Sequence, residues 1–357
     1  MIVETKSYSL YDNKILSGEF IMLNDDNKKI CLEQIGQSIN YCNEILREFC
    51  GKEISIKYSI ISSMDFNAKC SLLENGIYSI EILSEVFEKT FDILNTLLYE
   101  KNSQFYSIIS YGEENYNKVK ANKYLDIMHA ISTRLIIFHE LGHIFNGHLD
   151  YYQAHKTDKG LSFYMDSSRN NLPPLESQIL EMDADAFAAT RLVGQLTFPA
   201  NIDRLNGEIL DLIKGEMHTL ILLIVSSCLS FSIMGLGRKR EPGDYLNSKY
   251  LPLRTRQDYY VRCTLNAFRM LNRTLIDKVN AELLDIKFYR EVLYNIEQYV
   301  NLYFQEALGI PQKQMDSSNN KNELDEKLLS HADYLEEFWT REMRIKLLPF
   351  SYFDLAL

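Results

Sequence analysis

Residues 135–148 read LIIFHELGHIFNGH, an apolar run that contains the pattern His-Glu-x-x-His from His139 to His143. Positions four apart on an α-helix lie one turn above each other, so these two imidazoles project to the same side. Two imidazoles arranged in this way can bind one tetrahedral zinc ion. The pattern therefore predicts a helix over about residues 121–146, which carries two metal ligands and ends at Gly147, a residue suited to a left-handed cap.

Glu140 lies about a quarter turn from the two histidines, where it flanks a bound metal instead of binding it. Zinc lowers the pKa of a bound water from about 15.7 to about 7, and a neighbouring carboxylate can take the proton as the water attacks a carbonyl. We therefore expect Glu140 to be the general base. The alternative is a core helix with two buried histidines, which leaves polar groups unpaired in apolar surroundings.

A catalytic zinc needs a third protein ligand and an open fourth position. The metzincin pattern requires a glycine at position 146 and a histidine at position 149, but the chain has Asn146 and Leu149 there. A second predicted helix with the sequence ESQILEMDADAFAAT (176–190) offers a carboxylate. Glu181 and Asp185 share one face of it, and Asp183 points nearly the opposite way.

We expect Glu181 to be the third metal ligand and Asp185 to accept the free N–H of a metal-bound histidine. An acidic face exposed to solvent is the alternative interpretation of this helix, and its many apolar residues disfavour it. His148 follows just after the end of the first helix. It is a candidate contact for substrate, although we favour a role in capping the helix C-terminus, where the dipole attracts a cation.

The remaining patterns predict an α+β fold. Residues 29–50 form an amphipathic helical pattern with Phe49 on its apolar face, and residues 53–61 read as a strand. Residues 66–83 read as two strands around an Asn-Gly hairpin signal, and Ser84 is a candidate cap for the next helix. We expect a mostly helical, zincin-like domain with a small antiparallel sheet beside the metal-binding helix.

The chain divides into three predicted parts: an N-terminal helical segment (1–52), a catalytic domain (53–310), and a linker with a C-terminal helix (311–357). The clearest linker sequence is QKQMDSSNNKNELDEK at residues 312–327. The net charge of -11 argues against electrostatic binding of nucleic acid over the whole chain. The candidate for a local basic patch is residues 238–240.

The compartment is predicted from two further features. The six cysteines are irregularly spaced, which indicates reduced thiols in the cytoplasm, and the first residues lack the layout of a secretory signal. Residues 219–236, TLILLIVSSCLSFSIMGL, carry no charge and reach the lower limit for a membrane span. We favour a buried core helix over a membrane segment, which remains the alternative.

The two motifs, HELGHIFNGH at 139–148 and EMDADAFA at 181–188, resemble those of gluzincin peptidases. The greatest likeness is to the phage-exclusion peptidases of the Lit group, in which hairpin, metal helix, acidic helix and apolar helix follow in the same order. The resemblance covers roughly residues 53–270, and only the two metal motifs are specific. In the Lit group, the activity is cleavage of a host translation factor when phage infects.

Carried over residue by residue, the resemblance implies zinc ligation by His139, His143 and Glu181, catalysis by Glu140 and support from Asp185. Related peptidases often have the pattern H-P-P-L-x-x-R after the apolar helix. Here residues 250–256 read YLPLRTR, so a tyrosine replaces the histidine and one proline is lost.

Tyr250 and Arg256 are therefore the candidates for stabilising the oxyanion. Arg256 is also a candidate for an ion pair with an acid such as Asp185, and we favour this structural role.

Together these features predict a cytoplasmic zinc endopeptidase that binds one zinc ion per chain and cleaves a protein substrate. The alternatives are a regulatory or sensor protein that acts by binding through its zinc site, and a membrane-embedded peptidase that uses residues 219–236 as a span. No nucleic-acid partner is expected, and the oligomeric state is left open.

Overall fold

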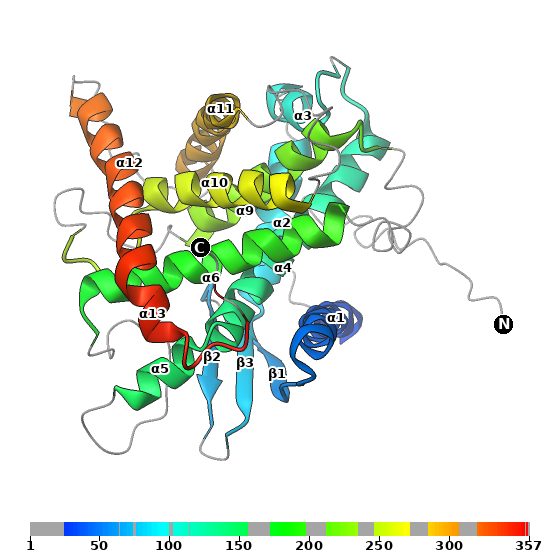
Figure 1. The fold of residues 1–357 in the computed structure, drawn as a ribbon. Coiled ribbons are helices and arrows are strands. Elements are labelled where there is room, and N and C mark those ends of the chain that lie inside the picture. Colours follow the sequence, from blue (N-terminus) through cyan, green and yellow to red (C-terminus); the bar gives the residue numbers. More distant parts are fainter. Residues whose placement is uncertain are drawn as a thin grey trace.

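Helix α4 (Lys118–Phe145) forms the middle of the fold and carries the His-Glu-x-x-His pattern. The computed structural model describes residues 25–63, 65–73, 76–99, 103–113, 115–155, 172–197, 212–234, 246–271, 285–306, 320–353 and 355. Within these ranges the protein is mostly helical, with a small three-stranded sheet. Figure 1 shows the sheet at the lower end of the molecule, between α1 (Asp25–Cys50) and α5 (His148–Ala154), with most of the helices above it.

The two ends of α4 follow from local sequence signals. The side chain of Asn117 accepts hydrogen bonds from the backbone N–H groups of Val119 and Lys120, at 3.0 and 3.2 Å. Such a bond satisfies donors that have no partner within the helix. At the other end Gly147 has φ 76°, in the left-handed region that favours glycine. The expected helix and its glycine cap are confirmed, with α4 beginning three residues earlier than predicted.

The three predicted strands are present as β1 (Ile56–Ile61), β2 (Ala68–Leu72) and β3 (Tyr78–Leu83), in the order β1-β3-β2. Strands β2 and β3 pair antiparallel, as the hairpin signal predicts. Strand β1 pairs parallel with β3, so the expectation of an antiparallel sheet is wrong and the sheet is mixed. The hairpin occupies one edge of β3, and β1 takes the remaining edge, where it runs in the same direction as β3.

Helix α1 (Asp25–Cys50) packs against α4 and β1 through an apolar face that includes Ile35, Ile39 and Cys42. Phe49 was predicted on this face, but it is 76% exposed because the last turn of α1 extends beyond the core. Ser84 precedes α2 (Glu85–Tyr99), but its hydroxyl bonds with the backbone of Ser63, so the expected side-chain cap is not made.

Four further helices complete the upper part of the fold: α3 (Ser103–Ile109), α9 (Glu216–Met234), α10 (Leu253–Leu271) and α11 (Ile286–Glu306). Of the described helices, α9 alone is long and apolar enough to cross a membrane. In this fold most of its side chains are buried, and it packs against α4, α10 and α11 as a core helix. The basic residues 238–240 lie outside the described residues.

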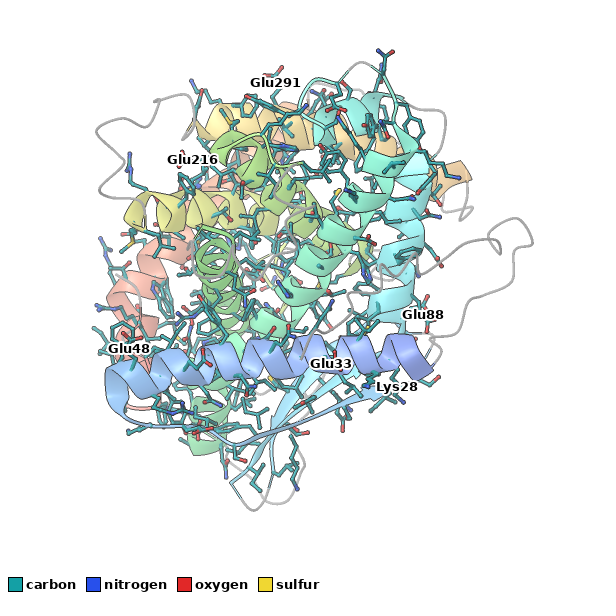
Figure 2. The ribbon with its side chains drawn as sticks, turned by 90° about the vertical axis from the view of Figure 1, so that its right-hand side faces the viewer. Lys28, Glu33, Glu48, Glu88, Glu216 and Glu291 are labelled. Carbon is teal, nitrogen blue, oxygen red and sulfur yellow. The ribbon has the colours of Figure 1, made fainter. Side chains whose placement is uncertain are left out.

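Figure 2 labels acidic side chains on several helices, together with Lys28 on α1. Glu33 and Glu48 project from α1, and the labelled Glu216 and Glu291 belong to α9 and α11. All four side chains are exposed. This face therefore agrees with the negative net charge of the chain.

The C-terminal part consists of α12 (Asn320–Phe338), a π-helical turn (Trp339–Met343) and α13 (Arg344–Leu347). Helix α12 already begins within the predicted linker, whose residues 312–319 lie outside the described part. After α13 the chain returns to α4, where the backbone N–H of Tyr352 donates to the carbonyl of Phe145 at 2.9 Å. A Cβ atom on Gly147 would lie 2.4 Å from the carbonyl carbon of Phe350, so the tail packs where only glycine fits.

Candidate metal centre

The candidate site forms where α4 crosses α6 (Pro174–Thr197), the predicted acidic helix. Gly142 of α4 faces Ala184 of α6, and a Cβ atom on Gly142 would lie 3.0 Å from the Cα and 3.2 Å from the carbonyl oxygen of Ala184. The two backbones are therefore nearly in contact at this crossing. Close approach of the helices lets one carboxylate on α6 reach two imidazoles on α4.

We expect substitutions at Gly142 to damage the site in proportion to their size. Alanine forces a shift of a few tenths of an ångström, and Gly142→Val adds a branched side chain against the backbone of Ala184. Overpacking of this kind costs about 1–3 kcal/mol, so Gly142→Val should lower both the unfolding temperature and zinc affinity, with Gly142→Ala between it and wild type. Thermal melts and zinc titrations measure the two effects. Wild-type zinc affinity in Gly142→Val would show that the close approach is not needed.

Three side chains at the crossing point their donor atoms at one position. The Nε2 atoms of His139 and His143 lie 3.2 Å apart. The carboxylate of Glu181 lies 3.4 Å from Nε2 of His139 through Oε2, and 3.6 Å from Nε2 of His143 through Oε1. Among the described residues this is the group of three that could hold a metal ion. The sequence-based expectation that these residues come together is confirmed.

The spacing of these donors suits a small tetrahedral cation. With zinc–ligand bonds of about 2.0–2.2 Å, tetrahedral angles require ligand atoms roughly 3.3–3.6 Å apart. The two Nε2 atoms lie 3.2 Å apart, close to the lower end of this range. The nearest oxygens of Glu181, Oε2 for His139 and Oε1 for His143, lie 3.4 and 3.6 Å from the two Nε2 atoms. Two imidazoles and one carboxylate also form a donor set typical of catalytic zinc, which keeps the fourth position open.

His139 is held from behind by the ion pair of Asp185 and Arg256. Its Nδ1–H donates to Oδ1 of Asp185 at 2.8 Å. Arg256 binds the same carboxylate through two bonds, from Nε at 2.6 Å and from Nη2 at 2.7 Å. The guanidinium also stacks over the ring of Phe231, 4.4 Å from its centroid. Asp185 and Arg256 therefore lie as the favoured structural interpretation predicts, and together they fix the orientation of one histidine.

His143 is held by a different set of contacts. Its Nδ1 lies 2.8 Å from Nδ1 of His148, whose Nε2 donates to Oδ2 of Asp183 at 2.9 Å. Asn146 donates to the same oxygen at 2.6 Å. The His148 ring thus contacts the side chains of His143 and Asp183. His148 also begins the short helix α5 (His148–Ala154), which disagrees with the expected capping role. The role of Asp183 was missed, because sequence spacing shows only that it points away from Asp185.

Glu140 lies beside the three donor atoms with one oxygen unsatisfied. Its Oε2 is buried and has no hydrogen-bond partner among the described residues. Its carboxylate also contacts the thiol of Cys70 on β2, a neighbour that the sequence did not reveal. Burial raises the pKa of Glu140, although the positive charge of His139 and the Cys70 contact oppose the shift. A buried carboxylate oxygen without a hydrogen-bond partner is costly, so Glu140 is expected to have a function.

The charges within the site are strongly coupled. Burial disfavours the charged form of His139, but Asp185 and Glu181 overcome this effect and raise its pKa to about 10. The pKa of Glu181 is held low despite burial, chiefly by its hydrogen bond to His139. Burial and the neighbouring His139 lower the pKa of His143 well below its usual value. In the metal-free site, His139 is therefore protonated and is the positively charged neighbour of Asp185 and Glu181. Binding of a metal ion displaces one of its protons.

A pocket opens onto the donor atoms. Its wall includes Ala68 at the start of β2, Tyr152 of α5 and Ser177 of α6, which lies one turn before Glu181. Tyr250 also lines this pocket and is 40% exposed, so it can reach a bound molecule. Side chains from the edge strand, the two motif helices and the segment before α10 therefore line this pocket together.

The thiols agree with the expectation of unpaired cysteines. The five cysteines whose side chains are described, Cys31, Cys42, Cys70, Cys228 and Cys263, are all free. Burial raises the pKa of the Cys70 thiol well above its usual value, which keeps it neutral beside Glu140.

Comparison of the chain with models of protein families, with curated proteins and with solved structures gave no match. The fold and the donor geometry are therefore the observations that bear on function. They support a mostly helical α+β protein in which His139, His143 and Glu181 form a group that could hold a metal ion.

Proposed function

We propose that this protein is a zinc-dependent endopeptidase of zincin-like type. The observation that carries the proposal is the convergence of the two Nε2 atoms, 3.2 Å apart, with the Glu181 carboxylate, whose nearest oxygens lie 3.4 and 3.6 Å from them. Zinc is the cation whose preferred ligands and geometry match this set. One ion per chain is expected, since the described residues provide one such group.

Each residue around the site has a role in the proposed reaction. Zinc bound by the three ligands supplies Lewis acidity and an activated water. Glu140 presents an unsatisfied oxygen beside the ligands, where it takes a proton during attack on the scissile carbonyl and returns it to the leaving amine. Arg256 is committed to Asp185, which leaves Tyr250 at the pocket wall as the candidate for stabilising the oxyanion.

The substrate is proposed to be an extended protein segment. Strand β2 is at the edge of the sheet, and Asn67 and Ala68 at its start line the pocket. An extended chain can add to such an edge through backbone hydrogen bonds. A cytoplasmic location and a role in phage defence, as the resemblance to the Lit group implies, belong to the same proposal.

A protein that acts only by binding is the second candidate. It needs the three metal ligands but gains nothing from the buried Oε2 of Glu140 beside them, which has no partner in the described part of the chain. That oxygen therefore favours the enzyme over the sensor.

Metal removal tests the proposal. The purified chain is expected to contain about one zinc ion and to cleave a quenched-fluorescence library of random decapeptides. Treatment with 1,10-phenanthroline should abolish cleavage, because activation of the water depends on the metal. Adding back zinc should restore it, whereas magnesium should not, since it prefers oxygen ligands. Cleavage that survives complete metal removal would contradict the proposal, as would a purified chain that binds no zinc.

A further inference from the structure

A chain of buried hydrogen bonds leads away from the candidate metal position on the His143 side. It passes from His143 to His148 and on to Asp183, which Asn146 also contacts. The rings of His143 and His148 are completely or almost completely buried, and Asp183 is only 5% exposed. Because these groups are almost completely buried, the hydrogen bonds among them determine where each proton lies.

The positions of the protons follow from the geometry. Nε2 of His143 faces the candidate metal position, so it must offer a lone pair and the ring must carry its proton on Nδ1. That N–H lies 2.8 Å from Nδ1 of His148, which must therefore be an acceptor. A neutral imidazole with Nδ1 unprotonated carries its proton on Nε2, and this atom lies 2.9 Å from Oδ2 of Asp183. Each bond in the chain then has one donor and one acceptor.

We propose that His148 is a positioning residue, which as a neutral acceptor holds His143 in the tautomer and orientation needed for metal binding. Asp183, supported by Asn146, fixes the tautomer of His148 in turn. The inference rests on the proposed metal site but does not depend on whether the site catalyses proteolysis.

The two histidine ligands are thus supported differently. His139 donates directly to the carboxylate of Asp185, which is ion-paired with Arg256. His143 donates to a neutral ring, and the nearest carboxylate on this side is one residue further along the chain of bonds.

Zinc affinity of four variants tests the inference. His148→Leu removes the acceptor, and we expect zinc affinity to fall by about 10- to 100-fold, as is usual when an outer partner of a ligand is lost. His148→Asn keeps an acceptor oxygen close to the position of Nδ1 and should recover at least half of the loss on a logarithmic scale. Asp183→Leu should weaken zinc binding, whereas Asp183→Asn keeps an acceptor for His148 and should stay close to wild type. Competition with a chromophoric zinc chelator measures all four.

A merely structural role would give a different result. It predicts that zinc affinity follows the thermal stability of the metal-free protein, so that His148→Leu and His148→Asn are equally impaired when equally stable. The visible spectrum of the cobalt-substituted protein provides a second readout, because a reoriented His143 changes the ligand field. We expect His148→Leu to alter this spectrum and His148→Asn to preserve it.

The outcomes separate this inference from the proposed function. Unchanged zinc affinity in His148→Leu, or equal loss in His148→Leu and His148→Asn, would overturn the role of His148 and leave the peptidase proposal intact. If His148→Leu fails to fold, Asp183→Leu and Asp183→Asn are compared instead. Equal zinc affinity in these two variants overturns the inference. A wild-type chain that binds no zinc would overturn both proposals.

Discussion

Glu140→Gln is expected to leave zinc in place and to abolish peptide hydrolysis. The glutamine side chain has nearly the same shape, and the three ligands His139, His143 and Glu181 are unchanged. It cannot accept a proton at neutral pH, so the contribution of a general base, about 10²- to 10⁴-fold, should be lost. Initial rates on the peptide library, together with the zinc content of the same preparation, measure both quantities.

Protein stability provides an internal check on this variant. Burial raises the pKa of Glu140, so its charged form is more costly in the folded protein than in the unfolded chain. This cost is present at pH values above the folded-state pKa and disappears as pH falls below the unfolded-state pKa, where the group is protonated in both states. A neutral glutamine removes it, and metal-free Glu140→Gln should melt at least as high as wild type at neutral pH.

The matched control is Asp126→Asn. Asp126 lies on the same helix, its side chain is exposed, and it is not among the residues that line the pocket. The substitution makes the same change of carboxylate to amide, and we expect it to retain full activity. Full proteolysis by Glu140→Gln would refute the assignment of the base, and full loss in Asp126→Asn would show that charge on α4 matters in a nonspecific way.

The ligands were predictable because helix geometry is local. The four-residue spacing of His139 and His143 alone fixes their shared direction, and the same argument relates Glu181 to Asp185 on α6. The convergence of the two helices could be expected only from chemistry, because zinc requires a third ligand. The structure supplies the physical reason, which is the small pair Gly142 and Ala184 at the crossing.

The contacts that the sequence did not predict all depend on tertiary packing. His148 follows a left-handed glycine that redirects the chain, so its direction cannot be calculated from the periodicity of α4. Its contact with Asp183 joins residues 35 positions apart. Cys70 approaches Glu140 from the sheet, and the parallel pairing of β1 depends on which edge of β3 the hairpin leaves open. Sequence patterns predict which face of a helix or strand a residue occupies. They do not predict which residues of other elements pack against that face.

Glu181→Ala is expected to remove the metal itself. Two imidazoles would remain, and a pair of neutral ligands on one helix leaves half of a tetrahedral zinc site to water. Loss of an outer partner costs about 10- to 100-fold in metal affinity, so loss of a direct ligand should exceed the upper end of this range. After dialysis, the zinc content should fall from about one ion per chain to nearly none, and hydrolysis should fall with it.

Two further substitutions show whether this loss is specific to the ligand. Glu291→Ala removes an exposed carboxylate from α11, far from the motif helices in sequence, and should bind zinc like wild type (Figure 2). Glu181→Asp keeps the charge but withdraws the oxygens by one methylene, so its zinc affinity should lie between wild type and alanine. If Glu181→Ala kept a full zinc ion at wild-type affinity, another donor would have to complete the site. The convergence of the two histidines and Glu181, on which the proposed function rests, would then be coincidental, because Glu181 would not be needed for binding.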